Sequence, residues 1–358
     1  MEKTDKVYTD LQAHLDKQAV GFPATKSGVE IRILKELFNP DQASLALHVN
    51  YKPQSARDIF NSQKDGGITM EKVSNMLEEM DSNGAIGSME KNGTKYYYTM
   101  PLLVGIVELH NSKATPQFSA DFNEYMKGEF GKAYASTSVS QMRTIPVEKS
   151  IRVENHVTTY DHIRDVIAST EGPIAINPCM CREGAAKRGQ PCHVTKRKET
   201  CMTFGDWARR AIEGGRSREI THEEALEIIR QNEADGLVLQ PTNYLKIDFV
   251  CSCCGCCCGI LKRQKMLPKP AESWAHNFYA AVDTEICTGC GTCVEKCQVN
   301  AVKIDEQNRY STINLDRCIG CGNCVASCPS EALRLVKKEK ETVPPEDCTS
   351  LYKILAER

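Results

Sequence analysis

The stretch VCSCCGCCCG, residues 250–259, places six cysteines within eight positions. Thiols this close together could form disulfides, bind metal ions or hold a redox cluster. The chain has 19 cysteines, and none of them precedes Cys179. The N-terminal segment MEKTDKVYTDLQAHLDK is polar and lacks the apolar core of a signal peptide, which predicts a cytoplasmic protein. Because disulfides are rare in a reducing compartment, we expect metal or cluster ligation.

A repeated cysteine pattern lies nearer the C-terminus. CTGCGTCVEKC begins at Cys287 and CIGCGNCVASCP at Cys318, and both follow the spacing C-x2-C-x2-C-x3-C. Each is followed by a stretch typical of a β-strand, AVKID at 301–305 and ALRLV at 332–336. Tight triplets with a distant fourth cysteine can surround the corners of a [4Fe-4S] cubane. A zinc ribbon would need two pairs instead, so the pattern favours two [4Fe-4S] clusters.

Residues 281–336 resemble the bacterial two-cluster [4Fe-4S] ferredoxin domain. The resemblance implies that the fourth cysteine of each run crosses to the other cluster. One cluster would then be bound by Cys287, Cys290, Cys293 and Cys328, and the other by Cys318, Cys321, Cys324 and Cys297. Gln298 stands where the family has a proline, which supplies no ligand, so we still expect the cluster. The small residues Gly289, Gly291, Gly320 and Gly322 should let backbone N–H groups approach the sulfur atoms.

Ten further cysteines lie in the middle of the chain. They fall into two groups, Cys179, Cys181, Cys192 and Cys201, then Cys251, Cys253, Cys254, Cys256, Cys257 and Cys258. The first group could supply four thiolates from one extended loop. Adjacent cysteines cannot all bind one cubane, so the second group holds spare thiols, serves two sites or binds an unusual cluster. We expect one or two additional iron–sulfur clusters ligated from both groups; a structural zinc site and reactive unligated thiols are the alternatives.

The tripeptide CCG occurs twice in the second group, at 253–255 and 257–259. It partly resembles the CCG modules of heterodisulfide reductase catalytic subunits, which hold non-cubane clusters in widely spaced repeats. The whole chain also resembles prokaryotic [4Fe-4S] binding proteins that join such a region to a ferredoxin tail and carry a winged-helix-like N-terminus. That second resemblance implies no assigned activity.

Positive charge gathers around the first group of cysteines. Residues 182–218 contain ten Lys and Arg against four Asp and Glu. A cluster held by four thiolates is anionic, and nearby cations raise its potential and lower the cost of burying it. A solvated basic face and a docking patch for an acidic redox partner are the alternatives.

The expected fold class is α+β with several domains. Residues 1–110 form a helical, winged-helix-like domain with helices at 29–38, 40–50, 55–64 and 69–81, followed by a hairpin that turns at Asn92-Gly93. Residues 111–139 form a helical linker, 140–280 an α+β cysteine-rich domain, 281–336 the ferredoxin domain and 337–358 a tail.

Within the cysteine-rich domain, strands are expected at 143–147, 173–177, 236–240 and 245–250, with the cysteines at strand ends and in loops. Helices are expected at 160–170, 204–214 and 221–234. Thr221 and Glu224 form the pattern of a capping box at the start of the last helix.

Charge argues against nucleic-acid binding. The helix in the recognition position, 68–81, carries Glu71, Glu78, Glu79 and Asp81 against Lys72, whereas phosphate binding needs the opposite sign. The net charge of −2 gives no general attraction to DNA or anionic membranes. The apolar run PLLVGIV at 101–107 is too short to cross a bilayer. Docking of this domain onto a protein partner is favoured.

No acid–base or nucleophilic constellation stands out, and no nicotinamide fingerprint GxGxxG opens a helix. His193, beside Cys192, is a candidate ligand. The leading hypothesis is an electron-transfer subunit that connects a donor, such as a flavoprotein, to a partner iron–sulfur oxidoreductase within a larger complex. The alternatives are an oxidoreductase that reduces a disulfide or other small substrate at an unusual cluster within Cys251–Cys258, and a redox-responsive DNA-binding regulator.

Overall fold

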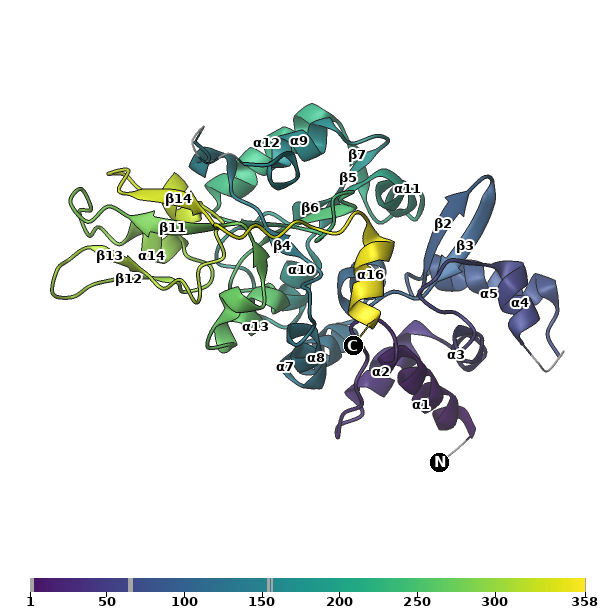
Figure 1. The fold of residues 1–358 in the computed structure, drawn as a ribbon. Helices are drawn as coiled ribbons and strands as arrows, with labels where there is room; N and C mark the ends of the chain where they lie inside the picture. Colours follow the sequence, from purple (N-terminus) through teal and green to yellow (C-terminus); the bar gives the residue numbers. More distant parts are fainter. Residues whose placement is uncertain (1–2, 64–66, 153–154, 156, 358) are drawn as a thin grey trace. The chain divides into compact units, whose positions relative to one another are not determined.

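The computed structural model describes residues 3–63, 67–152, 155 and 157–357. The chain forms two compact units, Met1–Ser138 with Tyr352–Arg358, and Val139–Leu351. Helices and strands both contribute to the fold, in agreement with the mixed class that the sequence predicts (Figure 1). In the described part of the chain, no helix combines the length and apolar character needed to cross a membrane.

The first unit contains helices at the four predicted places, although the one expected at 40–50 ends at Ala46, and it begins with a helix that was not predicted. Its helices are α1 (Lys3–Asp16), α2 (Val29–Leu37), α3 (Pro40–Ala46), α4 (Ala56–Ser62), α5 (Met70–Ser82), α6 (Val107–His110), α7 (Pro116–Lys127) and α8 (Glu129–Ala135). Lys64, the last residue of the helix expected at 55–64, lies outside the described residues. A short strand β1 (Gln54–Ser55) joins β2 (Gly87–Lys91) and β3 (Thr94–Tyr98) in one antiparallel sheet.

The predicted hairpin is confirmed. Lys91 pairs with Thr94 across a two-residue turn. Asn92 and Gly93 both adopt left-handed backbone conformations, with φ of 53° and 71°. Such a turn matches the twist of two antiparallel strands, which is why Asn-Gly is favoured there.

A five-stranded sheet organises the second unit, in the order β7-β5-β6-β9-β8. Its strands are β5 (Ile174–Pro178), β6 (Glu199–Phe204), β7 (Arg218–Ile220), β8 (Val238–Pro241) and β9 (Phe249–Cys253), and neighbours are antiparallel. β5, β8 and β9 overlap the strands expected at 173–177, 236–240 and 245–250, whereas β6 and β7 were not predicted. The strand expected at 143–147 is the shorter β4 (Arg143–Thr144), which pairs with β10 (Ala275–His276).

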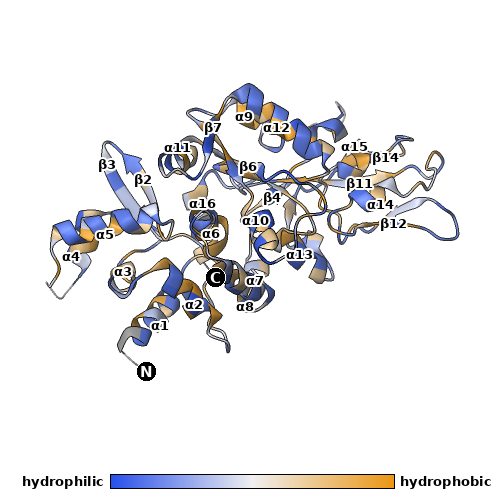
Figure 2. Cartoon of the chain, turned by 180° about the vertical axis from the view of Figure 1, so that it is seen from behind, coloured by the Kyte–Doolittle hydropathy of each residue, from blue (hydrophilic) through white to orange (hydrophobic). Residues whose placement is uncertain are grey.

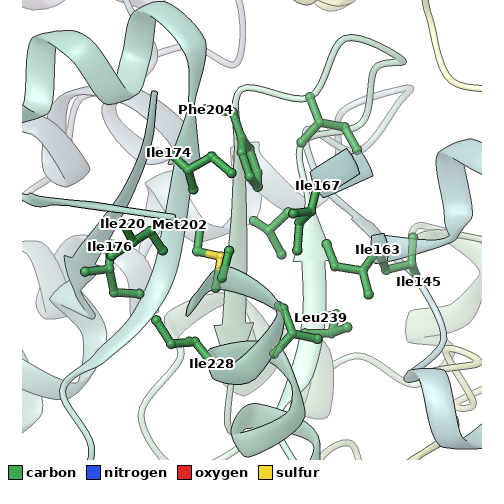
Figure 3. Packing of buried hydrophobic residues seen from close by; sticks show 14 of the residues in the cluster. Ile145, Ile163, Ile167, Ile174, Ile176, Met202, Phe204, Ile220, Ile228 and Leu239 are labelled. Atoms are coloured by element: carbon green, nitrogen blue, oxygen red, sulfur yellow. The ribbon is translucent and has the colours of Figure 1, made fainter. Parts of the chain in front are cut away.

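One face of this sheet carries the hydrophobic core. Side chains from β5, β6, β8 and β9 meet those of α9 (Ile163–Ala168) and α12 (His222–Ala234), as Figure 3 shows. Ile174, Ile176, Met202, Phe204 and Val250 are nearly inaccessible to solvent. The apolar residues Ala225, Ile228 and Ile229 of α12 recur at three-to-four spacing, so this helix covers the core with one side, and both hydrophobic and hydrophilic residues are visible along it in Figure 2.

The opposite face of the sheet carries thiols. Because successive side chains of a strand point to opposite faces, Cys201 lies opposite Met202, and Cys251 and Cys253 lie opposite Val250. Helices α10 (Met180–Lys187) and α13 (Gly259–Met266) lie on this other side of the sheet, away from α9 and α12 (Figure 1). The expectation that all central cysteines occupy loops and strand ends is therefore wrong for Cys201 inside β6, for Cys251 inside β9 and for Cys181 inside α10.

The helix-start prediction at Thr221 needs one correction. Thr221 Oγ1 accepts a hydrogen bond from the Glu224 backbone N–H at 3.2 Å, as an N-cap does. The Glu224 carboxylate instead pairs with Arg218 at 2.8 Å. In a capping box the Glu224 carboxylate would accept from the Thr221 backbone N–H. Here it forms an ion pair with Arg218 of β7 instead.

The C-terminal cysteine runs occupy a small α+β arrangement. β11 (Phe278–Val282) pairs with β14 (Leu333–Lys337), and β12 (Val302–Ile304) forms a hairpin with β13 (Ser311–Ile313). Two short helices, α14 (Thr292–Lys296) and α15 (Asn323–Ala326), each contain the third cysteine of a run. The strands predicted after each run are confirmed. Beyond them, the last helix is α16 (Cys348–Ala356).

Candidate metal centres

The two C-terminal cysteine runs are held by matching backbone contacts. Cys287 Sγ accepts from the N–H groups of Gly289 and Ser311, the latter at 3.4 Å. Cys318 Sγ accepts from those of Gly320 and Ala280, again at 3.4 Å for the second contact. N–H donors stabilise negative charge on sulfur, as a cluster ligand requires. The role predicted for the glycine after the first cysteine is thus confirmed in both runs.

Cys297 lies with the opposite run. Burial raises the pKa of Cys318, Cys321 and Cys324, and the nearby charge of Cys297 raises the pKa of each of them further. The pKa of Cys321 reaches about 12. Cys297 Sγ also accepts from the Ala301 N–H at 3.1 Å. The crossing of the fourth ligand stays a prediction. Among the described residues, no hydrogen bond joins Cys328 to the first run; its thiol contacts Ser330 Oγ at 3.7 Å.

The two runs differ in exposure. Cys290 is exposed, and Ile286 and Val294 beside it have relative accessibilities of 50% and 38%. Cys318 and Cys324 are buried. The second run is also tied to the segment that follows β4, because the Cys321 carbonyl accepts from the Val147 N–H at 3.0 Å. The first run therefore exposes one cysteine, Cys290, although its Cys293 is as buried as Cys318 and Cys324, and the second run has no exposed cysteine.

A group of four thiols forms in the central region, and we call it the four-thiol site. Its sulfur atoms all lie within 4.8 Å of one another and belong to Cys192, Cys254, Cys256 and Cys257. In the parts of the chain that the structure describes, this is the one group of three or more His, Cys, Asp or Glu side chains with such close ligand atoms. His193 contributes its backbone, which hydrogen-bonds to Cys256, and its imidazole is not part of the group.

The other six central thiols form a closed ring on the thiol-bearing face of the sheet, the six-thiol ring. Each thiol interacts with the next in the order Cys179, Cys181, Cys258, Cys253, Cys251, Cys201 and back to Cys179. Cys179, Cys253 and Cys258 are buried, and the other three are half-buried. Cys192 is thus separated from the other three cysteines of its predicted loop, and the second cysteine group is divided between two sites.

Helix starts and strand register bring the ring together. Cys179 and Cys258 are the residues that precede α10 and α13, and Cys258 accepts from the Leu261 N–H. Cys201 and Cys251 lie on the paired strands β6 and β9, one position beyond the pair Met202 and Val250. The partial positive charge of a helix N-terminus favours a thiolate over a thiol. The net effect differs along the ring. Contact with Cys179 and Cys251 lowers the pKa of Cys201, whereas the pKa of Cys258 is raised, because contact with Cys253 and burial outweigh the contact with Cys181.

Two arginines link the ring to the four-thiol site. Arg182 is 3% exposed, and its charge interacts with Cys179, Cys201 and Cys253 of the ring and with Cys254 of the four-thiol site. Its guanidinium donates to Thr200 Oγ1 and, at 2.9 Å, to the Ser252 carbonyl, while its Nε has no hydrogen-bond partner. Arg188 interacts with Cys181 and Cys257. A buried cation with thiols around it fits a site that becomes anionic when loaded.

Not all of the predicted basic region serves the thiols. Arg197 pairs with Asp235 at 2.7 Å, Arg209 with Asp206 at 3.0 Å, and Arg218 with Glu224 at 2.8 Å. These arginines complete surface ion pairs, which contribute little to stability. The expectation that basic residues lie next to the thiols thus applies to Arg182 and Arg188.

The thiolate form is already favoured at one ligand. The hydrogen bond from Cys257 lowers the pKa of Cys254 to about 5; burial opposes this shift, and the charge of Arg182 reinforces it. Thiolates, not thiols, bind metal ions. Cys254 is therefore prepared for ligation at neutral pH.

The departure from the ferredoxin pattern at Gln298 has a structural role that sequence reasoning missed. Gln298 Oε1 accepts from the Gly255 N–H at 2.7 Å, and Lys265 Nζ donates to the Gly255 carbonyl at 2.8 Å. Both backbone polar groups of Gly255, which lies between Cys254 and Cys256, are thus hydrogen-bonded. A proline at position 298 has no side-chain oxygen and could not accept from the Gly255 N–H. The glutamine that stands in place of the family's proline was therefore the feature of the sequence that could have indicated this contact.

These donor sets fit the groups that the sequence predicts. Eight thiols, most of which accept from backbone N–H groups, suit two clusters of the [4Fe-4S] type. Ten more thiols are divided between two sites. A family model for a 4Fe-4S dicluster domain matches residues 286–332. No curated protein and no solved structure matches the chain. Residues 286–332 are therefore similar to a ferredoxin-like iron–sulfur domain, in a chain whose cysteines support iron–sulfur cluster binding.

Proposed function

We propose that this chain is an iron–sulfur electron-transfer protein that relays single electrons between a redox donor and a partner oxidoreductase. The observation that carries the proposal is the pair of C-terminal cysteine runs, matched by a 4Fe-4S dicluster model, with Cys297 placed beside the second run. When bound, [4Fe-4S] clusters accept and release one electron at a time. The outer ligand set is Cys287, Cys290, Cys293 and Cys328, and the inner set is Cys318, Cys321, Cys324 and Cys297.

The difference in exposure supports a direction for the relay. Cys290 is exposed beside the apolar side chains of Ile286 and Val294, which suits contact with a redox partner. The inner set adjoins the cysteine-rich sheet, where Asn323 donates to the Gly236 carbonyl at 2.8 Å. The outer ligands would face the partner, and the inner ligands would face the central thiols.

The six-thiol ring is our candidate for a further iron–sulfur cluster in the central region. Its thiols come from both predicted cysteine groups, and Arg182 supplies positive charge next to them. Anaerobic purification with iron and sulfide quantification tests this: the C-terminal domain alone accounts for about eight irons, and an additional cluster raises the total to about twelve or more.

Redox spectroscopy tests the relay itself. Electron paramagnetic resonance of the reduced protein should show signals from more than one reduced cluster, and the reduced protein should pass electrons to a redox partner that co-purifies with it. Cys321→Ser should remove one C-terminal signal, whereas Cys348→Ser, which changes no residue of the two C-terminal ligand sets, the four-thiol site or the six-thiol ring, should leave the spectrum unchanged. An iron-free, colourless protein would contradict the proposal.

A second candidate function is disulfide or small-substrate reduction at the ring. The number of thiols favours it, because six ligands exceed the four that a cubane needs. The reaction would consume one disulfide, two electrons and two protons and give two thiols, with the electrons supplied by a reduced donor such as a flavoprotein. Turnover of heterodisulfide-like substrates with an artificial donor, lost on Cys253→Ser, tests it.

The regulator hypothesis receives no support from the charges of the first unit. Lys95, on the strand after the turn, contacts Glu78 at 2.5 Å and Asp81 at 3.0 Å, so its charge is compensated within the unit. The winged-helix assignment and docking of this unit onto a protein partner remain predictions. Absence of salt-sensitive DNA binding in both oxidation states would remove the regulator hypothesis.

A further inference from the structure

The four-thiol site has the dimensions of a single metal ion. The sulfur of Cys192 lies 3.7 Å from that of Cys254 and 3.6 Å from that of Cys256. The Cys256 sulfur lies 3.5 Å from that of Cys254 and 3.6 Å from that of Cys257. With zinc–sulfur distances of about 2.3 Å, tetrahedral geometry places ligand sulfurs about 3.8 Å apart. We propose that Cys192, Cys254, Cys256 and Cys257 bind one zinc ion, separate from the iron–sulfur clusters.

The same spacing argues against a cubane at these residues. Each thiolate of a [4Fe-4S] cluster binds a different iron atom, so its four ligands must stand further apart than those around one ion. The C-terminal thiols provide a comparison within the same chain. Among the described residues, neither the C-terminal runs nor the six-thiol ring contains three thiols that all lie within 4.8 Å of one another. The tight spacing thus distinguishes the four-thiol site from the other thiols.

The donor set and burial indicate a structural ion. Four thiolates in a tetrahedron suit zinc or iron–sulfur chemistry, and zinc sites with four protein ligands leave no position open for a substrate. Cys254 and Cys257 are buried, and Cys192 and Cys256 are half-buried. Ala185 and Leu237 pack against the thiols and restrict access of water.

The site would connect two distant segments. Cys192 follows α10, whereas the other three ligands lie between β9 and α13. Zinc bound here would fix the segment that delivers Cys258 to the six-thiol ring. The proposal gives the cysteine-rich region one structural ion and leaves six thiolates for a cluster, and it does not depend on whether the chain transfers electrons.

Metal analysis of the full-length protein tests the assignment. The protein is purified without air from cells supplied with both iron and zinc, and zinc, iron and sulfide are measured per chain. We expect about one zinc per chain, and X-ray absorption at the zinc edge should show four sulfur neighbours at about 2.3 Å. This measurement on the unaltered protein does not depend on the folding of any variant.

Matched variants locate the ion. Cys256→Ser and Cys257→Ser should each reduce zinc at least tenfold while most of the iron remains. Cys251→Ser and Cys253→Ser, which change neighbouring thiols of the ring, should lower iron and retain zinc. Cys348→Ser should change neither metal.

Four results would overturn the proposal. An unaltered protein without zinc, or with zinc that has nitrogen or oxygen neighbours, would contradict the four-thiolate site. A single iron without sulfide in place of zinc would overturn the identity of the ion. Equal loss of iron and sulfide in Cys256→Ser and Cys253→Ser would show that all ten central thiols serve clusters.

Discussion

The thiols of Cys192 and Cys254 lie 3.7 Å apart, although 62 residues separate them in the chain. The sheet brings them together, because β6 and β9 are neighbours and the segments next to these strands carry the two residues. A bond from both sulfurs to one ion would join these segments far more strongly than the weak contact between two thiols.

Removal of that ion should destabilise the second unit. A ligand that binds only the folded state stabilises it by RT ln(1 + [L]/Kd), so a structural ion contributes several kcal/mol. We expect a zinc chelator, applied without air, to lower the midpoint of thermal unfolding by roughly 10 °C or more, since about 1 kcal/mol corresponds to 2–4 °C for a domain of this size. Adding zinc back should restore the midpoint; an unchanged midpoint after complete zinc loss would contradict a structural role.

Gln298→Ala should loosen the four-thiol site. The substitution leaves the buried Gly255 N–H without its acceptor, which costs about 1–3 kcal/mol. Zinc should therefore be lost to a chelator about tenfold faster or more, while the iron content stays close to that of the unaltered protein. Gln307→Ala, at an exposed glutamine in the hairpin turn, is the matched control. Equal chelation rates for both variants would show that the contact is unimportant.

Gly289→Ala and Gly291→Ala should differ sharply in iron content. Both glycines have positive φ, 65° and 81°, so alanine is strained at either position by about 1–2 kcal/mol. A Cβ at Gly289 would lie 2.0 Å from the Arg309 carbonyl oxygen, whereas at Gly291 it meets nothing within 4 Å. We expect Gly289→Ala to lose about four irons and one reduced-cluster signal, and Gly291→Ala to retain them. Similar losses in both would attribute the effect to backbone strain alone.

Arg182→Gln should lower the potential of a central cluster. A buried cation favours the reduced, more negative state, and a charge-assisted contact of about 1.5–3 kcal/mol corresponds to roughly 60–130 mV for one electron. Potentiometric titration followed by electron paramagnetic resonance measures the shift. Arg182→Lys retains the positive charge, so its reduction potential should lie between those of Arg182→Gln and the unaltered protein. Arg209→Gln, at an exposed ion pair, should leave the potential unchanged. An unchanged midpoint in Arg182→Gln would mean that no central cluster senses this charge.

The C-terminal site was largely predictable because its ligands are close in sequence. Three cysteines in each run are separated by two residues, and glycines between them supply N–H groups over the same short distance. Such local geometry needs little information from the rest of the fold. Gln298 is the exception, because its partner Gly255 lies 43 residues away.

The division of the ten central thiols could not be predicted in this way. The division depends on the register of β6 and β9, which places Cys201 beside Cys251. It also depends on the alternation of side chains between the two faces of a strand, which turns Ser252 away from Cys251 and Cys253. β6 contains a cysteine that sequence reasoning assigned to a loop, so its pairing with β9 was not foreseen. Adjacent thiols then separate, with Cys257 in one site and Cys258 in the other.

The Gln298 contact has a consequence for maturation. The turn that presents Cys297 to the inner ligand set also holds the Gly255 peptide between two ligands of the four-thiol site. Cofactor insertion at the C-terminal runs would thereby preorganise the central loop, and a newly synthesised chain would fill its sites in sequence instead of independently.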